Sequence, residues 1–133
     1  MLDLIEAGYR YSGRPEPAVR GVSLSVAPGQ RWWWAGASGC GKSTLLRLAA
    51  GLTGRHGSGT LSGTVRLAGR DPAEVAPAER ASLVAYVAQE PADTFVAGTV
   101  ADEVAFGPES LGWSSERIRR VVGESLDLSL IHI

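Results

Sequence analysis

One stretch of this chain reads Gly36-Ala37-Ser38-Gly39-Cys40-Gly41-Lys42-Ser43. It matches the pattern Gly-x-x-x-x-Gly-Lys-Ser/Thr at every fixed position, which is the Walker A pattern. The apolar run 31–35 precedes this loop and predicts a strand, and the run 43–52 that follows is helix-like. Strand, glycine loop and helix in this order form the context that the pattern requires, so a chance glycine-rich turn is disfavoured.

The loop has the chemistry needed to hold a triphosphate tail. Its three glycines have no Cβ, so the backbone can turn tightly and bring its N–H groups against phosphate oxygens. The helix that begins near Lys42 adds unpaired N–H groups and the positive end of its dipole. We expect Lys42 to reach the β- and γ-phosphates, the Ser43 hydroxyl to bind Mg²⁺, and Thr44 to support the α/β-phosphate side.

Composition limits the classes of protein that the chain can represent. Its 133 residues suffice for one small domain, and the apolar share of 44% and charged share of 20% are ordinary for a globular protein. The net charge of −1 gives no basic field for binding nucleic acid. The single cysteine, Cys40, excludes an internal disulfide framework. His56 and His132 stand in no partner pattern and are expected to be solvated.

The sequence shows no targeting signal, which favours the cytoplasm. No apolar run reaches the length of about 18 residues that a membrane-spanning helix needs. The N-terminus alternates apolar and acidic residues and is not a signal peptide. The lone cysteine also fits a reducing compartment. We therefore expect a cytoplasmic chain.

Periodicity along the chain predicts an α/β fold. Alternating or short apolar runs predict strands over 2–9, 22–26, 30–35, 63–68 and 83–88. Helical segments are expected over 43–52, 99–106 and 114–126, with a short turn over 78–80. Trp32, Trp33 and Trp34 are expected to fill core space. Antiparallel-type strands ahead of a glycine loop predict a P-loop NTPase core, here partial, preceded by an N-terminal antiparallel β layer.

From about residue 2 to about residue 126, the chain resembles the ATP-binding subunit of ABC transporters. Tyr11 sits where this family places an aromatic ring that stacks on adenine, and the π-face of a ring is a good partner for a purine. The alternative for Tyr11 is a half-buried tyrosine at a strand end. The resemblance implies that Tyr11 and the glycine loop bind ATP together with Mg²⁺.

Gln89, in the segment Val-Ala-Gln-Glu-Pro, resembles the glutamine of this family's Q-loop. The resemblance implies that its amide oxygen reaches Mg²⁺ or orients the attacking water, beside the catalytic contribution of Lys42. The alternative is a solvated loop residue. Because the Tyr11 and Gln89 contexts match this family, they argue against another P-loop enzyme such as a small kinase.

Segments 89–95 and 99–112 are similar to the ATPase subunits of energy-coupling factor transporters, which include importers for cobalt, nickel and vitamins. Thr94 departs from the glutamine that is common there. The resemblance implies a transmembrane subunit as partner, with Phe95, Val104 and Phe106 lining an apolar groove for one of its helices. Core packing is an equally weighted alternative for these three residues.

The same resemblance implies how such a protein is assembled. A second ATP-binding subunit, identical or a paralogue, would face the first head to tail. The protein would be peripheral, at the cytoplasmic face of the membrane. The transported solute is chosen by a separate membrane protein and is not written in this sequence.

Family members carry three further motifs that this chain lacks: a signature Leu-Ser-Gly-Gly-Gln, a Walker B strand ending in Asp-Glu, and a switch histidine. Without them the chain is expected to bind nucleotide weakly and to hydrolyse it negligibly. We interpret residues 1–127 as the N-terminal portion of an ABC ATP-binding domain. Residues 128–133 match the translation of a transposase adapter used in DNA library preparation, which indicates a non-native tail. A native apolar C-terminal strand is the alternative.

The sequence thus predicts ATP binding and, in the full-length protein, ATP hydrolysis that powers import of a small solute through a membrane transporter complex. The rival hypothesis is a nucleotide-binding regulatory module that does not hydrolyse ATP. The missing Walker B motif is the only support for that rival, and truncation of the chain explains the same absence.

Overall fold

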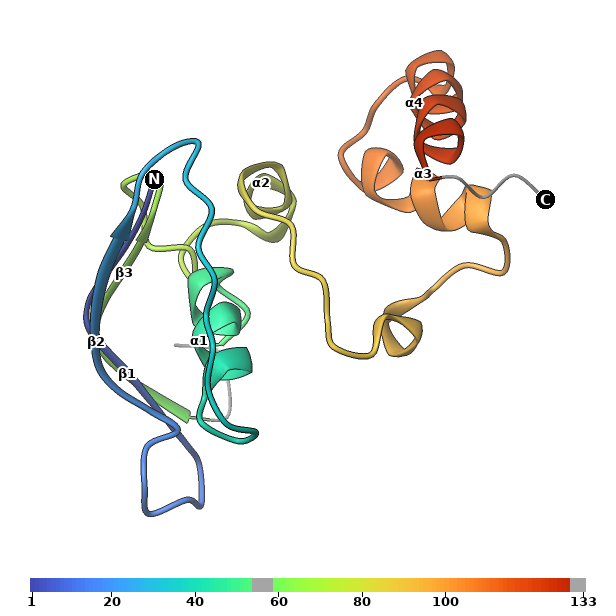
Figure 1. Ribbon diagram of the computed structural model, residues 1–133. Helices are drawn as coiled ribbons and strands as arrows, with labels where there is room; N and C mark the ends of the chain where they lie inside the picture. The colour runs from blue at the N-terminus through green and yellow to red at the C-terminus, as the bar shows by residue number, and fades with distance from the viewer. Residues whose placement is uncertain (54–58, 130–133) are drawn as a thin grey trace. The chain divides into compact units, whose positions relative to one another are not determined.

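The computed structural model describes residues 1–53 and 59–129 and divides the chain into two compact units, 1–86 and 87–133 (Figure 1). His56 and His132 lie outside the described residues, as do the last four residues of the predicted tail. None of the helices in the described ranges is long and apolar enough to cross a bilayer.

The first unit contains a three-stranded antiparallel sheet in the order β2-β1-β3. The strands are β1 (Leu2–Tyr11), β2 (Val19–Val26) and β3 (Gly59–Leu67). The central strand pairs with both neighbours, so that Leu4 lies opposite Leu24 on β2 and opposite Val65 on β3. The predicted N-terminal antiparallel β layer is confirmed: β1 ends two residues later than predicted, β2 begins three residues earlier, and β3 spans 59–67 instead of the predicted 63–68.

Helix α1 (Lys42–Ala49) covers one face of this sheet (Figure 1). A core of Leu4, Ala7 and Val65 is buried on that face, and Leu45 of α1 packs against it. Burial of these apolar side chains is the main force that holds helix and sheet together. The helix ends where Gly51 adopts a left-handed conformation (φ 68°), so it is shorter than the predicted run 43–52.

Two predicted strands are not formed. Segment 30–37 has no strand assignment, and Leu83 is the last residue of α2 (Pro77–Leu83), with 84–88 likewise outside any strand. A strand exists only where a neighbour completes its hydrogen-bond ladder. Within the described residues, the only ladders join β1, β2 and β3, so neither segment has such a neighbour. The apolar runs have strand propensity, but propensity does not show whether a neighbouring strand is present.

The tryptophan run corrects another expectation. Trp33 is 90% exposed and Trp32 is 51% exposed, so these two do not fill a core. Trp34 is half-buried, and its indole nitrogen is buried without a hydrogen-bond partner among the described residues. It lines an apolar cavity of about 490 Å³, together with Leu46 of α1 and Val84. The ring has its apolar surroundings but lacks an acceptor for its N–H group.

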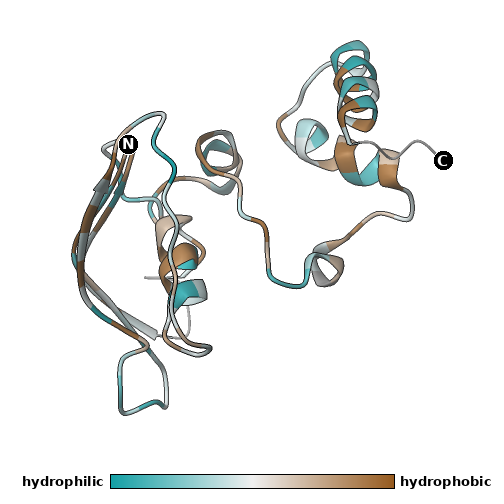
Figure 2. Cartoon of the chain, in the orientation of Figure 1, coloured by the Kyte–Doolittle hydropathy of each residue, from teal (hydrophilic) through white to brown (hydrophobic). Residues whose placement is uncertain are grey.

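The second unit contains the 3-10 helix η1 (Pro91–Thr94), α3 (Val100–Ser110) and α4 (Ser115–Leu128). Thr99 caps α3 by accepting a hydrogen bond from the Asp102 N–H group, and Ser114 caps α4 in the same way. Helices α3 and α4 pack against each other. Hydrophobic and hydrophilic residues alternate around α4 (Figure 2), as its amphipathic spacing predicts. Leu128, at the start of the predicted tail, is the last residue of α4.

Candidate functional site

The glycine-rich loop, residues 36–41, leads directly into α1. Gly39 (φ 79°) and Gly41 (φ 97°) adopt left-handed conformations that side chains with a Cβ rarely take. At Gly41 a Cβ would also collide with the backbone carbonyl oxygen of Ala18, on the return of the chain from β1 to β2. Ala18 is fixed in turn by a 2.8 Å hydrogen bond from its N–H group to the Tyr9 carbonyl oxygen. The hairpin therefore sets how closely the loop approaches the sheet.

The N-terminus of α1 is left open. Gly41 is its N-cap and offers no capping side chain, and the first turn contains no acidic residue. The first intrahelical bond runs from the Leu45 N–H group to the Gly41 carbonyl oxygen at 2.9 Å. The amides before Leu45 have no acceptor within the helix, and they stand at the positive end of its dipole. Such an end favours an anion over a cation.

Lys42 directs its ammonium back onto the loop. Nζ donates to the carbonyl oxygen of Gly36 at 2.8 Å and to that of Ala37 at 2.7 Å. It also lies 3.5 Å from Sγ of Cys40, which is exposed. No carboxylate in the described ranges lies within ion-pair distance of this nitrogen. Among the described residues its charge therefore meets carbonyl dipoles and a sulfur atom but no carboxylate, which leaves it available for an anion.

The next two residues of α1 differ in exposure. The Ser43 side chain is exposed, whereas Thr44 is 7% exposed. The Thr44 hydroxyl pairs with the Tyr11 hydroxyl at 3.1 Å. Tyr11 is half-buried and meets Tyr9 edge to face, with ring centroids 5.0 Å apart and an interplanar angle of 88°. The structure thus brings Tyr11, the predicted aromatic partner of a base, against the first turn of the helix that follows the loop.

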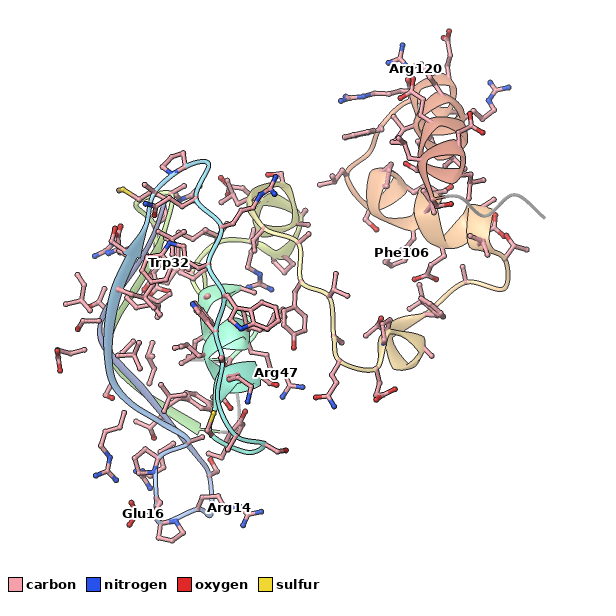
Figure 3. The ribbon with its side chains drawn as sticks, viewed as in Figure 1. Arg14, Glu16, Trp32, Arg47, Phe106 and Arg120 are labelled. Carbon is pink, nitrogen blue, oxygen red and sulfur yellow. The ribbon has the colours of Figure 1, made fainter. Side chains whose placement is uncertain are left out.

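Arg47 is a neighbour of this site that sequence reasoning missed. It projects from α1 (Figure 3), three residues after Thr44. Hydrogen bonds with the Tyr86 and Tyr11 hydroxyls raise the pKa of Arg47 above its ordinary value, so the guanidinium stays charged. The helical spacing of Arg47 from Thr44 could be read from the sequence, but nothing in the sequence indicated that Tyr11 and Tyr86 would both influence its guanidinium.

The first unit offers a fit for a nucleotide and its metal. Open amides and the Lys42 ammonium, which has no carboxylate partner in the described ranges, suit a polyphosphate. No cluster of three acidic, histidine or cysteine side chains that could hold a metal occurs among the residues described. Mg²⁺ does not need such a cluster, because it keeps several water ligands and binds phosphate oxygens together with one or two protein ligands. The exposed Ser43 hydroxyl fits the role of one such ligand.

Gln89 belongs to the second unit. It is exposed and comes directly before Glu90, the N-cap of η1. Its predicted role toward Mg²⁺ or water stays a prediction.

Comparisons with known proteins identify the family of this chain. The family model described as "ABC transporter" matches residues 19–129. A Streptomyces avermitilis protein, named "Putative ABC transporter ATP-binding protein", is 44% identical over 128 residues, which cover 96% of this chain and 23% of that relative. A relative of the same name from Methanosarcina acetivorans is 38% identical over 126 residues, which cover 95% of this chain and 20% of that relative. This chain spans less than a quarter of the length of either relative, and it belongs to the ABC transporter family, with the sequence of an ATP-binding domain.

Proposed function

We propose that this chain binds ATP through the glycine-rich loop and the N-terminus of α1, and that the whole protein hydrolyses ATP to drive a solute across a membrane. The observation that carries this proposal is the open helix end beside a lysine ammonium whose partners in the described residues are two loop carbonyls and the Cys40 sulfur, with no carboxylate among them. Such a site is arranged for a polyanion. Membership of the ABC transporter family supports ATP as that polyanion.

The residues of the loop divide the work of binding. Lys42 exchanges its loop carbonyl partners for oxygens of the β- and γ-phosphates, which are stronger acceptors because they are charged. The amides of the first turn of α1 donate to the same tail. The Ser43 hydroxyl ligates Mg²⁺, which supplies charge neutralisation on the phosphate oxygens. Tyr11 receives the base on a face of its ring that the T-shaped contact with Tyr9 leaves open.

Hydrolysis needs a group that orients water, and we assign this to Gln89. Its exposed amide can accept or donate a hydrogen bond and is not committed to a core. Orientation of the attacking water is the task of a glutamine in other phosphoryl-transfer enzymes. We propose transport in the import direction, by a complex of the energy-coupling factor type at the cytoplasmic face of the membrane. Similarity of segments 89–95 and 99–112 to that type supports this assignment.

The second unit offers a surface for a transmembrane subunit. Phe95 is 63% exposed and Phe106 is 51% exposed, which favours docking over core packing for these side chains. Phe95 and Val104 line a cavity of about 360 Å³. The Glu103 carboxylate holds its wall by accepting hydrogen bonds from the N–H groups of Val96 and Ala97, both at 2.9 Å. An apolar face of a partner helix fits such a groove.

The test uses the full-length gene product, with a second ATP-binding subunit present where the gene neighbourhood supplies one. We expect ATPase activity that falls at least about tenfold in Gln89→Ala while Mg·ATP affinity changes little, because the lost contact serves the transition state. Binding without any hydrolysis in the full-length protein would favour the regulatory module instead. In reconstituted complexes, Phe106→Ser should weaken assembly with the membrane subunit. The control Leu83→Ser, at another exposed apolar residue, should not.

A further inference from the structure

We propose that Thr44 is a positioning residue for nucleobase recognition, because its buried hydroxyl fixes the Tyr11 ring that receives the base. The inference rests on the proposed nucleotide site and adds a specificity role to it. Thr44 is thereby given a task distinct from the support of phosphates that its place in the loop motif predicts.

Burial restricts the hydrogen-bond partners that the Thr44 hydroxyl can use. Thr44 is 7% exposed, and a buried hydroxyl without a partner is costly. Its observed partner is the Tyr11 hydroxyl at 3.1 Å, from a strand 33 residues away along the chain. Because both groups can donate and accept, each can satisfy the other without help from water. The pair therefore fixes the outer end of the Tyr11 ring.

A further contact holds the same ring. Tyr9, which is 1% exposed, meets Tyr11 edge to face at 5.0 Å between centroids. This contact uses at most one face of Tyr11 and leaves the other for a planar ligand. The Tyr11 hydroxyl also contributes to the raised pKa of Arg47, which lies three residues after Thr44 on α1. The ring is thus preorganised, which lowers the entropy cost of stacking a base on it.

The geometry links recognition of the base to the helix that serves the phosphates. The same first turn of α1 carries the open amides and the Thr44 hydroxyl. Loss of the hydroxyl should loosen the ring, and only a ligand with a base should sense this. Inorganic tripolyphosphate carries the phosphate tail alone and provides the reference.

The experiment measures the affinity of the chain for Mg·ATP and for Mg·tripolyphosphate by calorimetry. The readout is the ratio of the two affinities, in wild type, Thr44→Val, Thr44→Ser and Tyr11→Phe. We expect the ratio to fall about threefold to tenfold in Thr44→Val and Tyr11→Phe, the range that corresponds to one lost hydrogen bond. Thr44→Ser restores the hydroxyl and should restore the ratio. The double variant Thr44→Val/Tyr11→Phe should be no worse than either single variant, because both remove the same pair.

The other outcomes overturn the inference in distinguishable ways. An unchanged ratio in both Thr44→Val and Tyr11→Phe would show that the hydroxyl pair does not position the ring, while wild-type ATP binding would leave the proposed function intact. An equal loss for both ligands in Thr44→Val, with Tyr11→Phe unaffected, would place Thr44 on the phosphates. Wild type that binds neither ligand would overturn the proposed function itself. Should Thr44→Val not fold, Tyr11→Phe decides alone, since it keeps the ring and removes one oxygen.

Discussion

Replacement of Gly41 by alanine tests how the hairpin holds the glycine-rich loop. The new Cβ would meet the Ala18 carbonyl oxygen, and the backbone would have to keep a φ of 97°. The left-handed conformation costs an L side chain about 1–2 kcal/mol. Forcing a methyl group into an occupied space costs about 1–3 kcal/mol more. The free energy of unfolding should therefore fall by about 2–5 kcal/mol.

Gly39→Ala is the matched control for this prediction. Gly39 also has a left-handed φ of 79°, but a Cβ there would meet no atom within 4 Å. It should lose only the conformational part, about 1–2 kcal/mol. Denaturant unfolding, followed by circular dichroism, compares the two variants with wild type. In thermal unfolding, the midpoint of Gly41→Ala should be at least about 8 °C lower than that of wild type. Equal losses in the two variants would refute the claim that Ala18 limits the approach of the loop.

Three further predictions concern single side chains. Alkylation of Cys40, whose Sγ lies 3.5 Å from Lys42 Nζ, should block Mg·ATP binding, while Cys40→Ser treated in the same way should bind; undiminished binding by alkylated wild type would contradict this. The Arg70 guanidinium lowers the pKa of Glu79 by a hydrogen bond and by its charge, so this pair stabilises the fold above the unfolded carboxyl pKa and loses its effect as pH falls through the lower folded pKa. Glu79→Gln should flatten that part of the stability–pH curve, and superimposable acid limbs would count against the pair. Trp34→Phe removes a buried N–H group that has no acceptor, so stability should stay equal or rise, and a loss beyond about 1 kcal/mol in urea unfolding would oppose this.

The sequence predicted those elements whose cause is local. Alternation along 2–9 and 22–26 predicted two strands of the antiparallel sheet, because one buried face imposes a period of two. Thr99 and Ser114 precede the two helices of the second unit as N-caps, and the amphipathic spacing of 114–126 predicted most of α4. The position of the glycine-rich loop could be predicted because its tight turn requires glycines, and their spacing is visible in the sequence.

Features that depend on distant parts of the chain could not be predicted. The apolar runs 30–35 and 83–88 have strand propensity, but a strand also needs a neighbour, and propensity is silent about that. Trp33 is apolar and yet 90% exposed, because no packing partner faces it within the residues described. The Tyr11–Thr44 pair joins residues whose types are common at a strand end and in a helix, and only the fold brings the two hydroxyls together.

The central claim is that the Lys42 ammonium and the open end of α1 bind a triphosphate. Calorimetric titration of wild type and Lys42→Ala with Mg·ATP tests it most directly, with Arg66→Ala as a control that removes a cation from an exposed strand position. A charged hydrogen bond is worth about 1.5–3 kcal/mol, so Lys42→Ala should bind about 10- to 150-fold more weakly, and Arg66→Ala should match wild type. Equal affinity of Lys42→Ala and wild type would contradict the account.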